Sequence, residues 1–143
     1  MSCNCNRSCN SNRGVVDALA KAICLLNEGI DDISKGLDAI RCGDTCCGEK
    51  LIRKGLCALE DALKILCNIA NHLSPFCNRQ VLNLICEAIC DIKEAIKGIE
   101  CALQNLGNAC RCQCDAIGDI EAALCKLEKA ENKLQKALCE LRF

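Results

Sequence analysis

Cysteine is the residue type through which this chain offers the most chemistry. Of the 143 residues, 18 are cysteines, a proportion typical of disulfide scaffolds and of metal stores. Half of them occur outside any local group, and the other nine occur in three local groups. The groups consist of Cys3, Cys5 and Cys9, of Cys42, Cys46 and Cys47, and of Cys110, Cys112 and Cys114. Thiolates form disulfides with one another and bind soft metal ions, so these are the two chemistries to weigh.

The spacing of the cysteines excludes several familiar sites. No Cys-x-x-Cys pattern occurs, so zinc ribbons, zinc fingers and thioredoxin-type redox centres lose their usual signature. His72 is the only histidine, and it lies on the polar side of a predicted helix, so we interpret it as a surface residue. The carboxylates recur beside lysines at the spacing of exposed helical ion pairs. We therefore expect no catalytic site and do not expect an enzyme.

The residues between the cysteines predict where the thiols point. Over residues 82–106, at 100° per residue, leucines and isoleucines gather on one side of a helix. Cys86, Cys90 and Cys101 gather about 140° from the centre of that apolar stripe. The cysteines that likewise leave the stripes of the other helices are Cys24, Cys57, Cys125 and Cys139. Because a buried thiol would share the stripe, we expect these side chains on the surface, with Cys67 at the edge of its stripe.

The apolar pattern predicts an all-α protein. Helices are expected over about residues 14–41, 49–73, 78–107 and 115–141, with Ser74-Pro75 ending the second and Gly107 capping the third. The stripe of the second helix consists of Leu51, Leu56, Leu59, Leu63, Leu66 and Leu73. With only 1% aromatic residues, the core must be built from leucine, isoleucine and alanine. Four long helices joined by short turns favour an up-down-up-down antiparallel four-helix bundle.

An internal repeat divides this bundle into two halves. A shift of 66 residues brings the apolar stripe of residues 19–40 onto that of residues 85–106, and Cys24 onto Cys90. We interpret residues 14–75 and 78–143 as two copies of a helix–cysteine turn–helix hairpin that together form one domain, 14–143. The interior glycines Gly29, Gly36, Gly55, Gly98 and Gly118 lower helix propensity. They either permit close helix contacts or are merely tolerated.

The first thirteen residues differ from the rest. Residues 1–13 are rich in serine, asparagine and cysteine and show no apolar periodicity. We expect a flexible N-terminal arm that carries Cys3, Cys5 and Cys9. Fully extended, it would reach roughly 40 Å, about the length of a neighbouring bundle.

Charge and hydropathy restrict the partners. Lys+Arg 18 against Asp+Glu 19 gives a net charge of −1, which argues against nucleic acid and anionic membranes as partners and favours self-association. No 18-residue apolar run and no signal peptide are present, so we expect no membrane insertion and synthesis in the cytoplasm. A cytosol keeps thiols reduced, so the sulfurs either bind metal there or become oxidised later.

Two functional interpretations remain. In the first, thiols spread over the surface, the turns and the arm cross-link neighbouring subunits. The predicted cross-linking cysteines are Cys3, Cys5, Cys9, Cys24, Cys42, Cys46, Cys47, Cys57, Cys90, Cys101, Cys110, Cys112, Cys114 and Cys125. In the second, thiolates store Cu(I) or Zn. The predicted ligands are then Cys42, Cys46, Cys47, Cys86, Cys90, Cys110, Cys112 and Cys114.

The chain resembles two families. The opening MSCNCNRSCN, the high cysteine content, the lack of a signal and the near-zero charge are similar to the cysteine-rich proteins of bacterial endospore coats and exosporia. That resemblance implies synthesis in the mother cell, assembly around the spore and later disulfide cross-linking. Cysteine-bearing four-helix bundles also resemble bacterial copper storage proteins, whose thiols fill the bundle. In this chain, by contrast, leucine and isoleucine are predicted to fill the interior. Only Cys86 and Cys90 show the Cys-x-x-x-Cys spacing on a predicted helix.

These observations favour a structural protein. We expect a small all-α subunit that assembles with itself, and with other cysteine-rich layer proteins, into a disulfide-reinforced layer or filament on a bacterial spore. No cofactor is expected in this interpretation, and Cu(I) or Zn is expected in the storage alternative.

Overall fold

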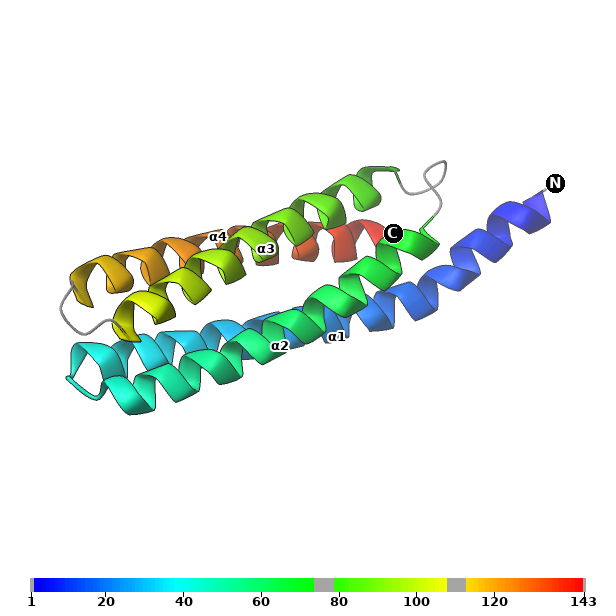
Figure 1. Cartoon of the computed structure of the whole chain (residues 1–143). Coiled ribbons are helices and arrows are strands. Elements are labelled where there is room, and N and C mark those ends of the chain that lie inside the picture. Colours follow the sequence, from blue (N-terminus) through cyan, green and yellow to red (C-terminus); the bar gives the residue numbers. More distant parts are fainter. Residues whose placement is uncertain (1, 74–78, 108–112, 143) are drawn as a thin grey trace.

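The computed structural model describes residues 2–73, 79–107 and 113–142, with side chains for 14–73, 79–106 and 115–141. The chain forms four helices, α1 (Ser2–Arg41), α2 (Thr45–His72), α3 (Arg79–Gly107) and α4 (Gln113–Arg142). They run alternately up and down the bundle, and the predicted four-helix architecture is confirmed (Figure 1). Within the described ranges no strand occurs.

The bundle consists of two helical hairpins. α1 packs most extensively on α2, and α3 on α4, while α1·α4 and α2·α3 form the smaller contacts between the hairpins. Among the described residues, no Cα of α1 lies within 8 Å of one in α3, and no Cα of α2 lies within 8 Å of one in α4, so these pairs lie diagonally across the bundle. This arrangement agrees with the two predicted hairpins, α1–α2 and α3–α4. The helices that the internal repeat relates, α1 with α3 and α2 with α4, are the diagonal pairs.

The prediction for the N-terminal segment was wrong in one respect. α1 begins at Ser2, not near Gly14, so residues 2–13 continue the helix beyond the rest of the bundle (Figure 1). No proline or glycine occurs in residues 2–13 to stop the helix. Extending an existing helix adds one hydrogen bond per residue without a new nucleus. The extension adds about 18 Å to α1 at 1.5 Å per residue.

A turn of only three residues joins α1 to α2. Gly43 adopts a φ of 96°, and its N–H donates to Ile40 O at 3.0 Å, while Asp44 N–H donates to Ala39 O at 2.8 Å. These two bonds form a Schellman motif that closes α1. Asp44 then caps α2, because its carboxylate accepts from Cys47 N–H at 3.2 Å. α2 therefore starts at Thr45, four residues earlier than predicted.

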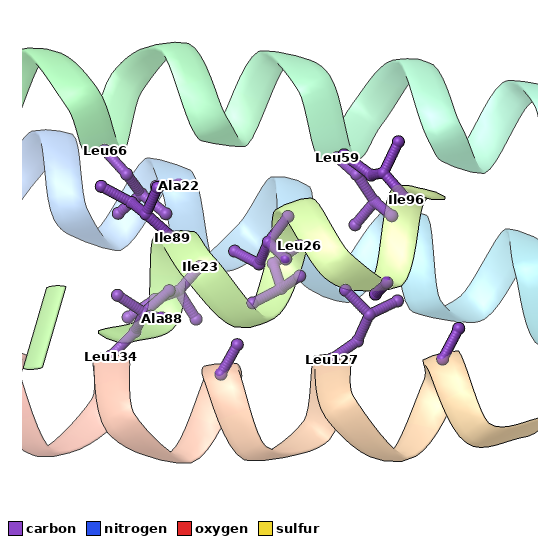
Figure 2. Packing of buried hydrophobic residues seen from close by; sticks show 14 of the residues in the cluster. Ala22, Ile23, Leu26, Leu59, Leu66, Ala88, Ile89, Ile96, Leu127 and Leu134 are labelled. Carbon is purple, nitrogen blue, oxygen red and sulfur yellow. The ribbon is translucent and has the colours of Figure 1, made fainter. Parts of the chain in front are cut away.

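Large buried side chains recur at every seventh position in each helix. Figure 2 shows leucine and isoleucine side chains from all four helices converging in the interior. The line consists of Leu19, Leu26, Ile33 and Ile40; Ile52, Leu59, Leu66 and Leu73; Ile85, Ile92 and Ile99; and Ile120, Leu127, Leu134 and Leu141. In α2 this line passes through Ile52 rather than the predicted Leu51, which is only half-buried. No described buried residue is polar or charged.

A second buried line consists of small residues, three positions after the first. It comprises Ala22, Gly29 and Gly36; Gly48, Gly55 and Ala62; Ala88, Ala95 and Ala102; and Ala116, Ala123, Ala130 and Ala137. We call this line the small seam. Alternating steps of three and four residues give a seven-residue repeat, the pattern of antiparallel coiled-coil packing. The small seam was not predicted.

The small seam brings the α1 and α2 backbones close together. A Cβ added at Gly36 would lie 2.6 Å from Ile52 Cγ1 and 2.7 Å from Gly48 O. One added at Gly55 would lie 2.7 Å from Ile33 Cγ1 and 2.8 Å from Gly29 O. These glycines therefore permit a close helix contact.

Gly98 and Gly118 lie outside this contact. A Cβ at either position would meet nothing within 4 Å. These two glycines are tolerated at the cost of helix propensity.

Alanine substitution should separate these two kinds of glycine. We expect Gly36→Ala to destabilise the bundle by about 1–3 kcal/mol, because the new methyl group overlaps backbone as well as side-chain atoms. Gly98→Ala should stabilise it by about 0.5–1 kcal/mol through helix propensity. Urea unfolding of reduced protein, followed by circular dichroism, measures both. An equal gain in stability for both variants would contradict the close contact.

Candidate functional site: the outward thiols

The described thiols lie on the outside of the bundle. Cys24, Cys42, Cys46, Cys47, Cys57, Cys86, Cys90, Cys101, Cys125 and Cys139 are exposed, and Cys67 is half-buried. The predicted exposure of the cysteines outside the stripes is confirmed, as is the position of Cys67 at the edge of the core. All eleven carry free thiols.

Five of these thiols occupy one equivalent position. Each follows a small-seam residue by two positions, which turns it about 200° away from the seam. These are Cys24, Cys57, Cys90, Cys125 and Cys139, and we call them the outward thiols. Each of the four helices carries at least one. The sequence shift of 66 relates Cys24 to Cys90, and a shift of 68 relates Cys57 to Cys125.

The outward thiols cannot bond to one another within one bundle. Neighbouring helix axes lie about 8–10 Å apart, and outward Cα atoms lie farther apart than the axes. A disulfide needs a Cα–Cα distance of about 4.4–6.8 Å. Cys125 and Cys139 share a helix but are separated by about 21 Å along it. A disulfide partner for any outward thiol must come from another cysteine or another molecule.

A second group of thiols lies at one end of the bundle. Cys42 is in the α1–α2 turn, while Cys46 and Cys47 belong to the first turn of α2. The expectation that all three lie in the turn before the second helix is therefore corrected for Cys46 and Cys47, which lie in α2 after its Asp44 cap. The end of α3 and the start of α4 lie at this same end of the bundle (Figure 1).

Several predicted site residues lie beyond what the structure describes. Cys110 and Cys112 are outside the described residues, and only the helical backbone is described for Cys3, Cys5, Cys9 and Cys114. In the described part of the chain, no group of three or more His, Cys, Asp or Glu side chains is placed to hold a metal ion. His72 is exposed as predicted, and its Nδ1 donates to Asn68 O at 2.8 Å.

Ion pairs join α3 and α4 on the surface that carries the thiols. Lys126 Nζ lies 3.3 Å from Glu94, and Lys133 Nζ lies 2.9 Å from Asp91 and 3.5 Å from Glu87, so these two lysines of α4 bind α3. The sequence pattern predicted pairs within one helix. Such pairs also occur, between Lys35 and Asp31 and between Arg53 and Glu49.

The ion pairs of Lys133 hold at neutral pH. The hydrogen bond from Lys133 to Asp91 raises the pKa of Lys133 above its ordinary 10.5. Because the folded pKa is the higher one, the contribution of the lysine to stability is complete below pH 10.5. It is lost only as the pH rises through the raised value.

One outward thiol lies in a groove between the two hairpins. Cys125 and Leu124 of α4 line it opposite Leu37 and Asp38 of α1, and Arg41 binds Glu121 across its end. This ion pair joins residues 80 positions apart, so sequence reasoning had no local signal for it.

Comparison of the chain with protein-family models, with curated proteins and with solved structures finds no match. Among the described helices, none combines the length and the apolar character needed to cross a membrane. The function must therefore be argued from the placement of the thiols.

Removing thiols from the surface should leave the fold intact. We expect the combined replacement of Cys24, Cys57, Cys90, Cys101 and Cys125 by serine to change stability by at most about 0.5 kcal/mol per position, because exposed side chains contribute little to folding. Far-UV circular dichroism and urea unfolding under reducing conditions provide the measurement. Leu59→Ala, which empties a fully buried position, should cost about 2–5 kcal/mol as the matched control. A loss of helicity in the serine variant would mean that these thiols support the fold.

Proposed function

We propose that this protein is a structural subunit that assembles with copies of itself into a layer or filament reinforced by disulfides. The observation that carries the proposal is the placement of exposed thiols at the same outward position on all four helices. A thiol in that position has no partner among its equivalents in the same bundle. It can meet one on a neighbouring molecule, because it is exposed on the outside of the bundle.

Folding and cross-linking use different residues in this proposal. The core is apolar in all four helices and includes none of the exposed cysteines. The subunit therefore folds in its reduced form and reaches its place in the assembly before any sulfur bond forms. Oxidation then fixes contacts that already exist, and the product resists heat and detergent because its bonds are covalent.

The proposed location is the coat or exosporium of a bacterial spore. The support is the resemblance of MSCNCNRSCN and of the composition to proteins of those layers. Such a layer reconciles synthesis in a reducing cytoplasm with later oxidation. Other cysteine-rich layer proteins are the natural additional partners, and the role is structural rather than catalytic.

Gel electrophoresis tests the covalent assembly. Assembled protein boiled in SDS without reductant should remain of high molecular weight, and partial reduction should release a ladder at multiples of 15.5 kDa. Monomers that migrate cleanly without reductant would contradict the proposal. Storage of Cu(I) or Zn is the competing function, and several equivalents of metal per chain after purification under reducing conditions would favour it.

The N-terminal extension offers a second test. Residues 2–13 prolong α1 past the bundle and carry Cys3, Cys5 and Cys9, so we expect them to join subunits. Deleting residues 2–13 should leave a folded bundle whose assemblies dissolve more readily in SDS. A deletion variant with assemblies of unchanged detergent resistance would show that the cross-links use only the turn and helix-face cysteines.

A further inference from the structure

The outer face of α2 carries an ordered set of charges around Cys57. Arg53 and Lys54 lie one turn before the cysteine, and Glu60 and Asp61 lie one turn after it. All five side chains are exposed. Cations and anions thus stand three and four residues from the thiol on opposite sides.

Most of these charged side chains form no ion pair within the described part of the subunit. Arg53 Nε lies 3.3 Å from the Glu49 carboxylate, in a pair of solvent-accessible side chains. Lys54, Glu60 and Asp61 form no ion pair within 4.0 Å among the described side chains. Lys54, Glu60 and Asp61 are therefore available to a partner. Arg53 would exchange its solvent-exposed ion pair with Glu49 for one with the partner.

This order of charges is complementary to itself under a two-fold axis. When two copies of α2 lie antiparallel about an axis through Cys57, the residue at 57 + k faces the residue at 57 − k of the second copy. Arg53 then faces Asp61, and Lys54 faces Glu60. Each contact occurs twice, as in any isologous interface. Parallel docking would place like charges together, so the charges select the antiparallel direction.

The geometry of helix packing agrees with a bond at the axis. Two helices at an interaxial distance of about 9–10 Å, with the facing Cα atoms 2.3 Å from each axis, bring those atoms to about 4.4–5.4 Å. That separation lies within the range of a disulfide. Lys50 faces Lys64 of the second copy one further turn from the axis, where solvent and salt screen their repulsion.

Cys24 and Cys90 lack this pattern. Around Cys24, the same axis would place Lys21 opposite Asn27, which offers no opposite charge. Around Cys90 it would place Glu87 opposite Lys93, but Glu87 already lies 3.5 Å from Lys133 of α4.

Cys125 is an outward thiol with one oppositely charged pair at equal distances before and after it. There the axis would place Glu121 opposite Lys129, but Glu121 is bound to Arg41 of α1. Its other facing pair, Ala122 and Glu128, is not complementary. Of the four thiols compared, only Cys57 has two complementary pairs.

We propose that α2 docks antiparallel on α2 of a second copy of this chain, and that oxidation joins the two Cys57 thiols at the two-fold axis. This inference rests on the proposed covalent assembly and assigns it a first, specific contact. Exposed ion pairs are individually weak, so the docked pair is transient until the disulfide captures it.

The capture step is a thiol–disulfide exchange. One Cys57 thiolate attacks a small disulfide such as oxidised glutathione, and one glutathione thiol leaves. The Cys57 thiolate of the second copy then attacks the protein sulfur of the mixed disulfide, and the second glutathione thiol leaves. Two protein thiols are oxidised and one glutathione disulfide is reduced.

Charge reversal in the full-length protein tests the docking. The acidic variant is Arg53→Glu/Lys54→Glu, and the basic variant is Glu60→Lys/Asp61→Lys. Each alone should give about tenfold less Cys57–Cys57 disulfide than the natural chain at low salt, because every facing pair becomes repulsive. An equimolar mixture should recover the yield as a heterodimer, and a chain that carries all four changes should recover it as a homodimer.

Mass spectrometry reads the bond directly. Reduced proteins are oxidised with glutathione disulfide, alkylated and digested with trypsin, which releases residues 55–64 of the natural chain with Cys57 as their one cysteine. The acidic variant releases residues 51–64 and the basic variant releases residues 55–60. The disulfide-linked peptide pair of the heterodimer therefore has its own mass. The matched control, Lys21→Glu/Glu28→Lys beside Cys24, should leave the Cys57 yield unchanged.

The outcomes separate this inference from the proposed function. Equal Cys57–Cys57 yields in the natural chain and in each charge variant would overturn the two-fold docking, even where other disulfides still join subunits. Failure of both the mixture and the fourfold variant to recover the yield would also overturn it. Absence of intermolecular disulfides from every protein would overturn the covalent assembly as well.

Discussion

The close contact of small residues between α1 and α2 is the constraint on which the rest of this structure depends. Where Gly36 meets Gly48 and Gly29 meets Gly55, there is no space for another methyl group. This contact restricts the rotation of α1 and α2 about their axes. The rotation in turn fixes which residues face the core, and therefore which cysteines face solvent.

The fold could be predicted from leucine and isoleucine because their burial follows a helical period. The small seam could not, because glycine and alanine look alike whether they are packed, as at Gly36, or exposed, as at Gly118. The start of α1 was also missed, since a polar segment carries no amphipathic signal while an existing helix still extends through it. Exposure of the thiols followed from the apolar stripe, whereas their shared position two residues after the small seam required the seam itself.

Folding and cysteine chemistry use different residues of this chain, the apolar core for the first and the exposed surface for the second. The described apolar interior includes none of the exposed thiols. The charges between the thiols are then free to determine orientation, and those around Cys57 differ from those around Cys24 although the two cysteines lie at equivalent positions. Thiols at equivalent positions but with different charged neighbours could therefore react in sequence, one before the others, under the same oxidant.

The presence of an outward thiol on every helix has a consequence known from polymer chemistry. A monomer with two reactive groups grows into a line, whereas a monomer with more than two branches into a gel once enough bonds have formed. With exposed thiols on all four helices, the subunit of the proposed assembly would belong to the second kind. An ordered lattice therefore requires that weak contacts arrange the subunits faster than the oxidant joins them, and a pulse of strong oxidant would trap an amorphous network instead.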